Sequence, residues 1–378
     1  MVLCTGLVFT SMPALIPSAQ ANSCPLEDAF AGGGRGPSYG PREWYVSSDI
    51  YGIRSSTNPS NPLAGKDWFV DCQWGEAWTN SRISSPRVQE QLAPIRVQPI
   101  LKWFGPTKDG VYQTVSAYLE RVADQAPGAL PLLVWSKMES GYCNPSGYKP
   151  PDPRVYSSPV YRENVQEFKA ALLDHPMPVA VVVEPDQLAS LGCLPSGAKR
   201  SKLARIAYAV DQLSTIPGVT AYVDAGASDW MGWKTMLGYL RRVGINKVRG
   251  FALNTTHYDW TLDNVAYGNQ IARRLGKHFV VNTSRNGNGP ITPQLRQQGY
   301  EGGCNIPNAG LGLAPTTRTH SSLADAYLWT LNPGFGDGPC RHGKNYQTDR
   351  VRWDTPLALR IVRQYSNQLR GKKITYNS

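Results

Sequence analysis

The chain of 378 residues is 41% hydrophobic and 18% charged, a composition typical of globular proteins and sufficient for a large buried core. Beyond the N-terminal residues no segment approaches the ~20 consecutive apolar residues of a membrane-spanning helix, so we expect no membrane partner. Lys and Arg exceed Asp and Glu by 11 charges, but no basic run or nucleic-acid-binding motif accompanies this excess. A solvated basic surface is therefore favoured over a nucleic-acid partner, and we expect a monomer.

The first residues have the pattern of a secretory signal peptide. An apolar run from Val2 to Phe9 precedes a small-residue cleavage site at 19–21, although the usual basic start is missing. We therefore predict a signal peptide at residues 1–21 and a secreted protein, with a buried N-terminal strand as the alternative. Residues 22–60 are predicted to be an N-terminal connector, and residues 61–378 one folded domain.

Short apolar runs recur along this domain, with helical stretches between them. The runs are Val97–Phe104, Pro131–Trp135, Pro178–Val183, Val219–Val223, Lys247–Leu253, His278–Val281 and Ala326–Leu331. They are continuous rather than alternating, as in strands that are buried on both faces. The intervening stretches have helix spacing, for example at Val111, Val115 and Val122. This alternation predicts the α/β class, and about seven strands without a G-x-G-x-x-G motif favour a distorted parallel β/α barrel.

Acidic side chains follow three of these predicted strands. Asp186 comes after the third run, Asp224 after the fourth, and Asp337 after the last. In a parallel barrel the loops after the strands build the active site, so these carboxylates should meet at one mouth. A single acidic residue at a strand end is more often a helix cap or an ion-pair partner. Three at one rim instead favour glycoside hydrolysis, in which one carboxyl protonates the leaving oxygen and another handles water.

Tryptophans lie at or just beyond the same strand ends, at Trp103, Trp135, Trp230, Trp233 and Trp260. Flat aromatic rings stack on the apolar faces of sugars, which predicts a polysaccharide substrate, although each ring alone is as compatible with core packing. The five histidines are scattered and form no H-E-x-x-H motif, so we expect no metal and no cofactor.

At these residues the sequence resembles family 6 of the glycoside hydrolases, inverting cellulases that comprise endoglucanases and cellobiohydrolases. The resemblance runs from NPLAGKDWFV (Asn61–Val70) to DAYLWTLNPGFGDG (Asp325–Gly338), with its segments in family order. It includes VVVEPDQL (Val181–Leu188), YVDAGASDWMGW (Tyr222–Trp233) and RGFALNTTHYDW (Arg249–Trp260). The resemblance implies a distorted barrel of the kind predicted above.

The resemblance also implies a role for each carboxylate. Asp186 matches the general acid of the family, and Asp224 a structural or electrostatic aspartate. Asp337 matches the debated base, or the end of a water relay to it. Trp230 and Trp233 match family tryptophans.

Further substrate-binding candidates complete the predicted site. Asn254, His257 and Arg285 lie in matched segments at strand ends, and we expect them to contact substrate together with Trp103, Trp135 and Trp260. Ser146, in the loop after the second strand, could hold a water.

Six cysteines would remain after signal removal, an even number consistent with export. The two family disulfides would fall on Cys143–Cys193 and Cys304–Cys340, which leaves Cys24–Cys72. Only Gly338 and Pro339 separate Asp337 from Cys340. The family's cellobiohydrolases carry a long roofing loop here, so this short link predicts an open cleft and internal cuts.

Several positions depart from the family pattern. The aspartate of its R-D-C motif is Tyr142, and the tryptophan before Cys304 is Gly303. A strand-end aspartate is Asn282, and a Lys and a Glu near the last aspartate are Leu331 and Phe335. These positions normally grip sugars next to the cleavage point or support the water chain.

Three hypotheses follow from these departures. The sequence favours a secreted inverting endo-β-1,4-glucanase acting on cellulose or a related β-glucan, because all three carboxylates remain. The alternatives are a hydrolase of another, anionic or substituted polysaccharide, or an inactive relative that binds glycan.

Overall fold

The computed structural model describes residues 60–71, 85–96, 98–105, 110–138, 156–340, 344–348 and 351–369. The predicted signal peptide lies outside these ranges, as does almost all of the connector. So do Tyr142, Ser146 and the cysteines Cys24, Cys72 and Cys143, and the side chain of Cys193 is not described either.

Seven parallel strands form one sheet in which each strand pairs with the next along the chain. The strands are β1 (Lys102–Phe104), β2 (Leu132–Trp135), β3 (Val179–Val183), β4 (Val219–Asp224), β5 (Gly250–Leu253), β6 (His278–Asn282) and β7 (Ala324–Leu328). The sheet curls so that its first and last edges meet, through a parallel bridge of Ile100 with Trp329 and a 3.0 Å bond from Leu101 N to Trp329 O. The predicted distorted parallel β/α barrel is therefore confirmed.

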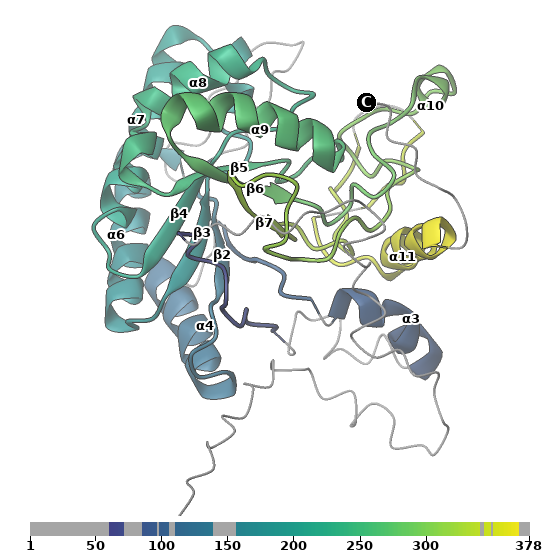
Figure 1. Ribbon diagram of the computed structural model, residues 1–378, viewed down its shortest axis with the longest axis horizontal. Helices are drawn as coiled ribbons and strands as arrows, with labels where there is room; N and C mark the ends of the chain where they lie inside the picture. The colour runs from purple at the N-terminus through teal and green to yellow at the C-terminus, as the bar shows by residue number, and fades with distance from the viewer. Residues whose placement is uncertain are drawn as a thin grey trace, which may run out of the picture.

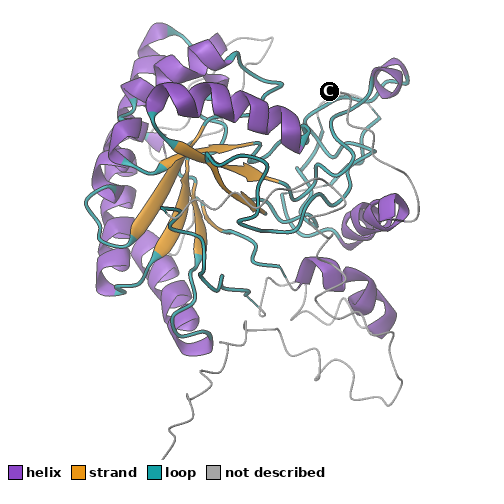
Figure 2. Ribbon diagram, in the orientation of Figure 1, coloured by secondary structure: helices purple, strands orange, loops and turns teal. Residues whose placement is uncertain are grey.

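Helices cover one side of this curled sheet more completely than the other. They are α3 (Pro86–Arg96), α4 (Val111–Gln125), α6 (Ser158–Asp174), α7 (Ser196–Leu213), α8 (Trp233–Arg242), α9 (Thr261–Leu275), α10 (Pro293–Gln297) and α11 (Thr355–Leu369), with short 3-10 turns η2 (Ala189–Cys193) and η3 (Ile245–Lys247). In Figures 1 and 2, α4, α6, α7, α8 and α9 lie outside the sheet, whereas loops fill the side beyond β7 and lead to α10 and α11. None of the helices in the described part of the chain is long and apolar enough to span a membrane.

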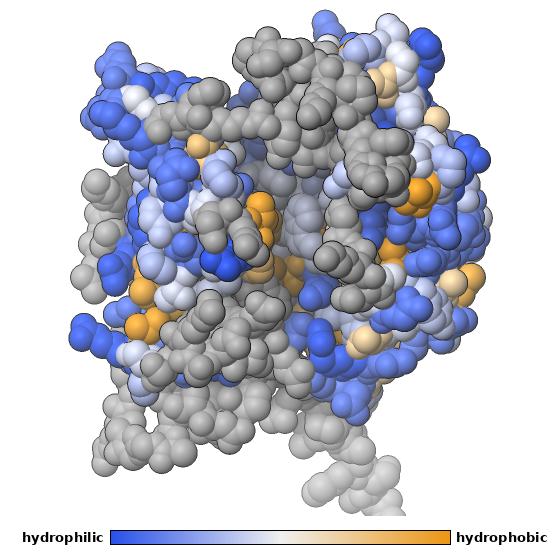
Figure 3. All heavy atoms as spheres, turned by 180° about the vertical axis from the view of Figure 1, so that it is seen from behind, coloured by the Kyte–Doolittle hydropathy of each residue, from blue (hydrophilic) through white to orange (hydrophobic). Residues whose placement is uncertain are grey.

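Successive strand residues enter two different cores. In β2, Leu132 and Val134 join the cluster inside the barrel, whereas Leu133 and Trp135 join the larger cluster under the helices. Every residue of β2 and β3 is buried, which explains why these strands appear in the sequence as continuous apolar runs. On the face opposite to Figure 1 the described surface is mostly hydrophilic, with apolar residues in small groups (Figure 3).

A buried ion pair connects strands that are not neighbours. Asp325 of β7 is fully buried and accepts two hydrogen bonds of 2.8 Å from the guanidinium of Arg249, just before β5. The hydroxyl of Tyr222, in β4, donates a third bond of 2.7 Å to the same carboxylate. A buried carboxylate is stable only when it is paired in this way, so the pair fixes β7 against β4 and β5.

We predict that Asp325→Ala lowers the free energy of unfolding by about 3–5 kcal/mol, because the guanidinium of Arg249 and the hydroxyl of Tyr222 lose their partner. A matched control is Asp211→Ala, which removes a pair with Lys247 between side chains that are about half exposed. The control should cost less than about 1 kcal/mol. Urea unfolding of both variants measures the difference, and equal losses would contradict the prediction.

Candidate active site

The turn after β3 presents Asp186 in a conformation that costs free energy. Glu184 and Asp186 have φ angles of 53° and 70°, in the left-handed region that residues with a side chain rarely adopt. The Glu184 carboxylate compensates by accepting bonds of 3.1 Å from the backbone N–H groups of Lys137 and Met138, after β2. The backbone N–H of Asp186 donates a 3.0 Å bond to Asp224 Oδ1, at the end of β4. The two neighbouring strands therefore hold this turn in place.

A buried lysine supports the same turn from behind. Lys202 of α7 is 1% exposed, and its ammonium donates to the side-chain oxygen of Gln187. The amide of Gln187 in turn donates a 3.4 Å bond to the carbonyl of Pro185. The position of the Asp186 turn thus depends on packing between α7 and β3.

The Asp186 carboxyl group is poised to keep a proton. Burial raises its pKa, and the bond of 2.6 Å that the Thr256 hydroxyl donates to Oδ1, with the charge of His257, only partly offsets this effect. The side chain is nevertheless partly exposed, so it can reach a substrate. A partly exposed carboxyl with a raised pKa is what general acid catalysis requires.

Asp224 lies beneath Asp186 and is fully buried. Its Oδ1 accepts the N–H groups of Asp186 and Gly226, each at 3.0 Å. Burial, followed by the charge of Asp186, raises the pKa of Asp224 to about 7. The two carboxyl groups therefore titrate as an interacting pair.

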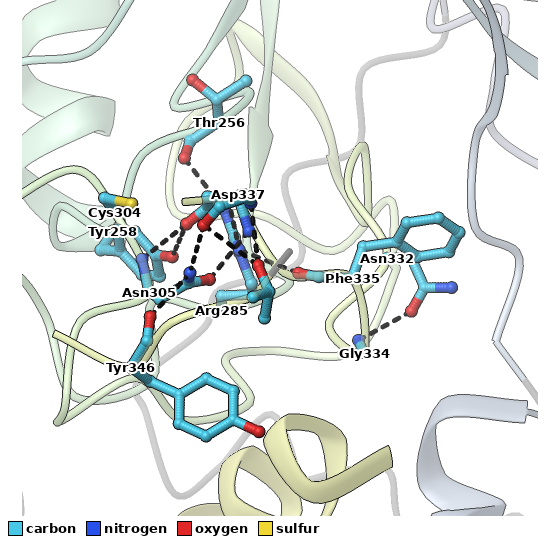
Figure 4. Close-up of polar contacts among 12 residues, drawn as sticks. Thr256, Tyr258, Arg285, Cys304, Asn305, Asn332, Gly334, Phe335, Asp337 and Tyr346 are labelled. Atoms are coloured by element: carbon cyan, nitrogen blue, oxygen red, sulfur yellow. Dashed lines mark hydrogen bonds and ion pairs between the residues drawn. The ribbon is translucent and has the colours of Figure 1, made fainter. Parts of the chain in front are cut away.

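Asp337 occupies the centre of a separate network (Figure 4). It accepts bonds of 2.9 Å from Arg285 Nη1, 2.7 Å from the Tyr258 hydroxyl and 2.7 Å from the backbone N–H of Asn305. Arg285 is 1% exposed, lies over the Tyr258 ring at 4.5 Å, and also donates to the carbonyl of Thr256 at 3.2 Å. The hydroxyl of Thr256 donates to Asp186, and its carbonyl accepts from Arg285, which binds Asp337. Thr256 therefore connects the two carboxylates.

A disulfide fixes the loop that carries Asp337. Cys304 and Cys340 are bonded, with their Cα atoms 5.8 Å apart, so this predicted pair is confirmed. Asn305, next to Cys304, exchanges backbone and side-chain bonds with Asp337 and donates a 3.1 Å bond to the Gly338 carbonyl. The short link after Asp337 is thereby held against the loop that contains Cys304.

Trp230 offers a ring face at the edge of this site. It is 37% exposed and stacks on the imidazole of His257, with ring centroids 4.5 Å apart and an interplanar angle of 14°. His257 Nδ1 lies 3.1 Å from Asp229. Burial lowers the pKa of His257, but the bond and charge of Asp229 outweigh burial and raise it. One face of Trp230 is covered by the imidazole, and the remaining exposed surface can receive a sugar.

Two further predicted tryptophans keep some exposure. Trp103 packs against the inner core and donates from Nε1 to the carbonyl of Thr330, beside the seam between β1 and β7. Trp260 lies directly against Gly289, where a Cβ would come within 2.1 Å of the ring. Both remain candidates for substrate contact.

Three predicted substrate-binding residues, Trp135, Asn254 and Arg285, are instead buried and structural, whereas Trp233 keeps some exposure and stays a candidate. Trp135 is 1% exposed and packs against Phe168 at 4.7 Å, because the last residue of β2 faces the helices rather than the barrel mouth. Trp233 packs against the outer core and lies under the guanidinium of Arg274, 4.2 Å away. Asn254 is fully buried, so its side chain cannot meet a substrate.

Asn254 shows what such a strand-end amide does. Its Nδ2 donates to the carbonyls of Asp259 at 3.1 Å and Asn282 at 3.0 Å, and its Oδ1 accepts the Asp259 N–H. Asn282 returns the contact by donating to the Asn254 carbonyl at 2.9 Å. The pair ties the ends of β5 and β6 together, so Asn282 has a structural use at a position where the family resemblance led us to expect an aspartate.

Sequence reasoning missed the residues that hold Asp186 and Asp337. Thr256, Tyr258 and Asn305 lie inside segments that carry the family resemblance, but nothing in their spacing marks them. Gln187 lies inside such a segment as well, whereas Lys202 gave no signal, since it sits in an ordinary amphipathic helix.

Comparison with known proteins gives the same assignment as this geometry. A model of the glycosyl hydrolases family 6 matches residues 63–371. The chain belongs to this family. Endoglucanase A of Cellulomonas fimi is 41% identical over 80% of this chain and 62% of its own length, so the chain spans less than two thirds of that relative. Endoglucanase 1 of Streptomyces halstedii is 30% identical over 70% of this chain and 79% of that protein.

Other similar proteins include one named a cellobiohydrolase and one solved endoglucanase. A probable 1,4-beta-D-glucan cellobiohydrolase C of Aspergillus terreus is 32% identical over 47% of this chain and 44% of its own. The solved endoglucanase Cel6 of Mycobacterium tuberculosis, in complex with methyl-cellobiosyl-4-deoxy-4-thio-β-D-cellobioside, has 30% identity and a TM-score of 0.70. That match covers 81% of this chain and 99% of the other. The family model thus places the chain among the glycosyl hydrolases of family 6 without deciding between endo and exo action.

We predict that the family 6 site makes this protein less stable as the pH rises. Asp224 has a pKa of about 7 when folded and about 3.9 in an unfolded chain, so the folded state binds its proton more tightly. Its stabilising contribution is complete below about pH 4 and is lost as the pH rises through 7. In Asp224→Asn, the decrease in unfolding free energy between pH 4 and 8 should shrink by about 1 kcal/mol or more. Urea unfolding at both pH values tests this, and an unchanged decrease would contradict it.

Proposed function

We propose that the protein is a secreted endo-β-1,4-glucanase that hydrolyses cellulose or a related β-glucan with inversion, using Asp186 as its general acid. The observation that carries this proposal is the paired arrangement of two carboxylates. Asp186 is buried enough to retain a proton, whereas Asp337 is paired with the buried guanidinium of Arg285. In this arrangement Asp186 can donate a proton and Asp337 can serve the attacking water.

The proposed reaction assigns one step to each group. Asp186 transfers its proton to the glycosidic oxygen as the bond from that oxygen to the anomeric carbon breaks. A water attacks the same carbon from the opposite side and loses its proton to a base, which gives a product of inverted configuration. The Thr256 hydroxyl, which donates to Oδ1 of Asp186, leaves the other oxygen to carry the proton.

Asp337 is the base we propose. Arg285, Tyr258 and Asn305 donate to it from three sides, which fixes the direction of its remaining lone pairs. The family resemblance implies a second carboxylate at position 142, where this chain has Tyr142. Without that group, activation of the water rests on Asp337 or on a water relay that ends there.

The substrate assignment draws on the relatives and on Trp230. The Mycobacterium tuberculosis endoglucanase is solved with a thio-linked cello-oligosaccharide, and the two bacterial relatives described above are both named endoglucanases. The exposed ring of Trp230 beside the carboxylates suits the flat face of a β-1,4-linked glucose chain. We therefore propose a β-glucan polymer as the partner and a secreted location, as for an enzyme that meets an insoluble substrate.

A second candidate is a glycan-binding protein that has lost turnover. The replacements at Tyr142, Gly303 and Leu331 favour it, since the family normally uses these positions near the cleavage point. The intact bonds around Asp186 and Asp337 favour the enzyme instead. Release of reducing ends from a soluble β-glucan by the purified protein separates the two candidates.

We predict that Asp186→Asn lowers kcat on unactivated β-glucan at least about a hundredfold, because the leaving oxygen loses its proton donor. On a dinitrophenyl cellobioside, whose leaving group needs no proton, the same variant should lose far less. Asp211→Asn, on the exposed face of α7, serves as the folded control with wild-type rates. Retention of more than a tenth of the wild-type rate on glucan would show that another group is the acid.

The Cys304–Cys340 disulfide supports an internal mode of cutting. It fixes Cys340 only three positions after Asp337, so this segment cannot extend over the substrate as a roof. An unroofed cleft admits a chain anywhere along its length. We predict that the viscosity of a soluble substituted glucan falls before much reducing sugar appears. Cellobiose as the dominant first product, with viscosity nearly unchanged, would indicate exo action instead.

A further inference from the structure

Trp230 and His257 reach the mouth of the site from two different turns. Trp230 lies between β4 and α8, and His257 follows β5. The indole and the imidazole stack with their ring centroids 4.5 Å apart and an interplanar angle of 14°. The stack therefore joins two separate loops of the barrel rim, and the orientation of the Trp230 ring depends on both of them.

The turn that carries His257 is fixed by buried groups. Its backbone N–H donates a 3.2 Å bond to the carbonyl of Asn254, which is fully buried. The side-chain amide of Asn254 donates to the carbonyls of Asp259 and Asn282, at 3.1 and 3.0 Å. The imidazole is therefore presented by a well-anchored part of the rim.

The turn that carries Trp230 is attached to the same region. The N–H of Ser228 donates a 3.2 Å bond to Asn264 Oδ1, near the start of α9, and the Ser228 hydroxyl donates to Asp259. These bonds fix the backbone, but the Trp230 side chain has torsions of its own and is 37% exposed. The stacked imidazole supplies a contact that can hold the ring at one angle.

Asp229 holds the imidazole in its turn. Its Oδ1 lies 3.1 Å from Nδ1 of His257. Because Asp229 directly precedes Trp230, the three residues form a closed set of contacts: a hydrogen bond from Asp229 to His257, a ring stack from His257 to Trp230, and a peptide bond that completes the set. Such a set restricts side-chain rotation more than either contact would by itself.

The charge of the imidazole strengthens this arrangement. Charged side chains that act on His257 or line the adjoining cavity are Asp186, Asp224, Asp229, Arg296 and Glu301. Burial lowers the pKa of His257, but the bond and charge of Asp229 and the charges of the two other aspartates outweigh burial and raise it. A protonated imidazole is attracted to the face of an indole, as in other cation–π contacts.

We propose that Asp229 and His257 form a positioning pair that holds the Trp230 ring at the angle at which it meets a sugar of the substrate. The inference rests on the polysaccharide-binding role proposed above and names the residues that support it. His257 acts on the sugar through Trp230, and Asp229 acts through His257.

The stack can be detected without a substrate. A protonated imidazole quenches the fluorescence of an indole that it contacts. The emission of Trp230, measured as the difference between wild type and Trp230→Phe, should therefore increase as the pH rises through the pKa of His257. The midpoint should move to lower pH in Asp229→Asn, which removes a charge that raises this pKa. The pH dependence should be lost in His257→Gln. A wild-type difference that is constant with pH would overturn the proposal, as would a midpoint that Asp229→Asn leaves unchanged.

Calorimetric binding of a thio-linked cello-oligosaccharide, which is not hydrolysed, tests the effect on the sugar. Asp229→Asn should raise Kd about threefold to tenfold, because a ring that rotates freely before binding must lose that freedom on binding. Asp263→Asn is the matched control, since it removes an exposed carboxylate in the first turn of α9, outside this set of contacts. Its Kd should stay within about twofold of wild type.

A double-mutant cycle separates positioning from direct contact. In the Trp230→Ala background, Asp229→Asn should have no further effect on Kd, because the ring that it positions is gone. An equal loss of affinity in both backgrounds would show that the pair binds the sugar directly, and would overturn the positioning role while leaving the proposed hydrolysis untouched. If the cycle has the expected outcome but the protein releases no reducing ends from β-glucan, the hydrolysis fails and the positioning pair stands.

Discussion

The hydrogen bond from the backbone of Asp186 to the carboxylate of Asp224 is the contact on which the rest of the active site depends. It joins the end of β3 to the end of β4 and holds Asp186 at a φ of 70°, where an aspartate would not stay by itself. The same bond requires the acceptor, the carboxylate of Asp224, to lie fully buried beneath the Asp186 N–H. The positive φ of Asp186 and the burial of the Asp224 carboxyl group are therefore both tied to this one hydrogen bond.

Burial of acidic groups at the sheet edge has a thermodynamic cost and a chemical use. Glu184 and Asp224 each have a pKa raised to about 7 by burial, although both accept two backbone N–H groups. Such groups destabilise the fold when they ionise, and active sites commonly trade stability for function in this way. The chemical use is that burial of Asp186 itself raises the pKa of its carboxyl group, as a proton donor requires.

The residues that orient the carboxylates differ from those near the expected sugars in how far they depart from the family pattern. The carboxylates and the residues that orient them form closed networks, from Lys202 through Gln187 on one side and from Arg285 to Asp337 on the other. Replacements relative to the family resemblance are found where sugars would be gripped, as at Gly303 and Leu331, and at Tyr142, where the resemblance implies a carboxylate that supports the water chain. Contacts to a ligand can be exchanged one at a time, whereas the members of a coupled hydrogen-bond network cannot.

The sequence by itself determined the barrel and the three carboxylates, since buried parallel strands must be apolar along their whole length and their ends must meet at one edge. It could not determine which way a strand-end residue points. Trp135 ends its apolar run and packs under α6, whereas Trp103 lies one residue before the end of its run and faces the barrel. Alternate residues of a strand enter opposite faces, and the register is set by pairing with neighbours. Nor could it place Thr256 or Lys202 against Asp186 and its turn, because these contacts join segments up to 70 positions apart. Local patterns encode the strands and their ends, whereas the partners of each carboxylate are decided only when the sheet curls and brings its loops together.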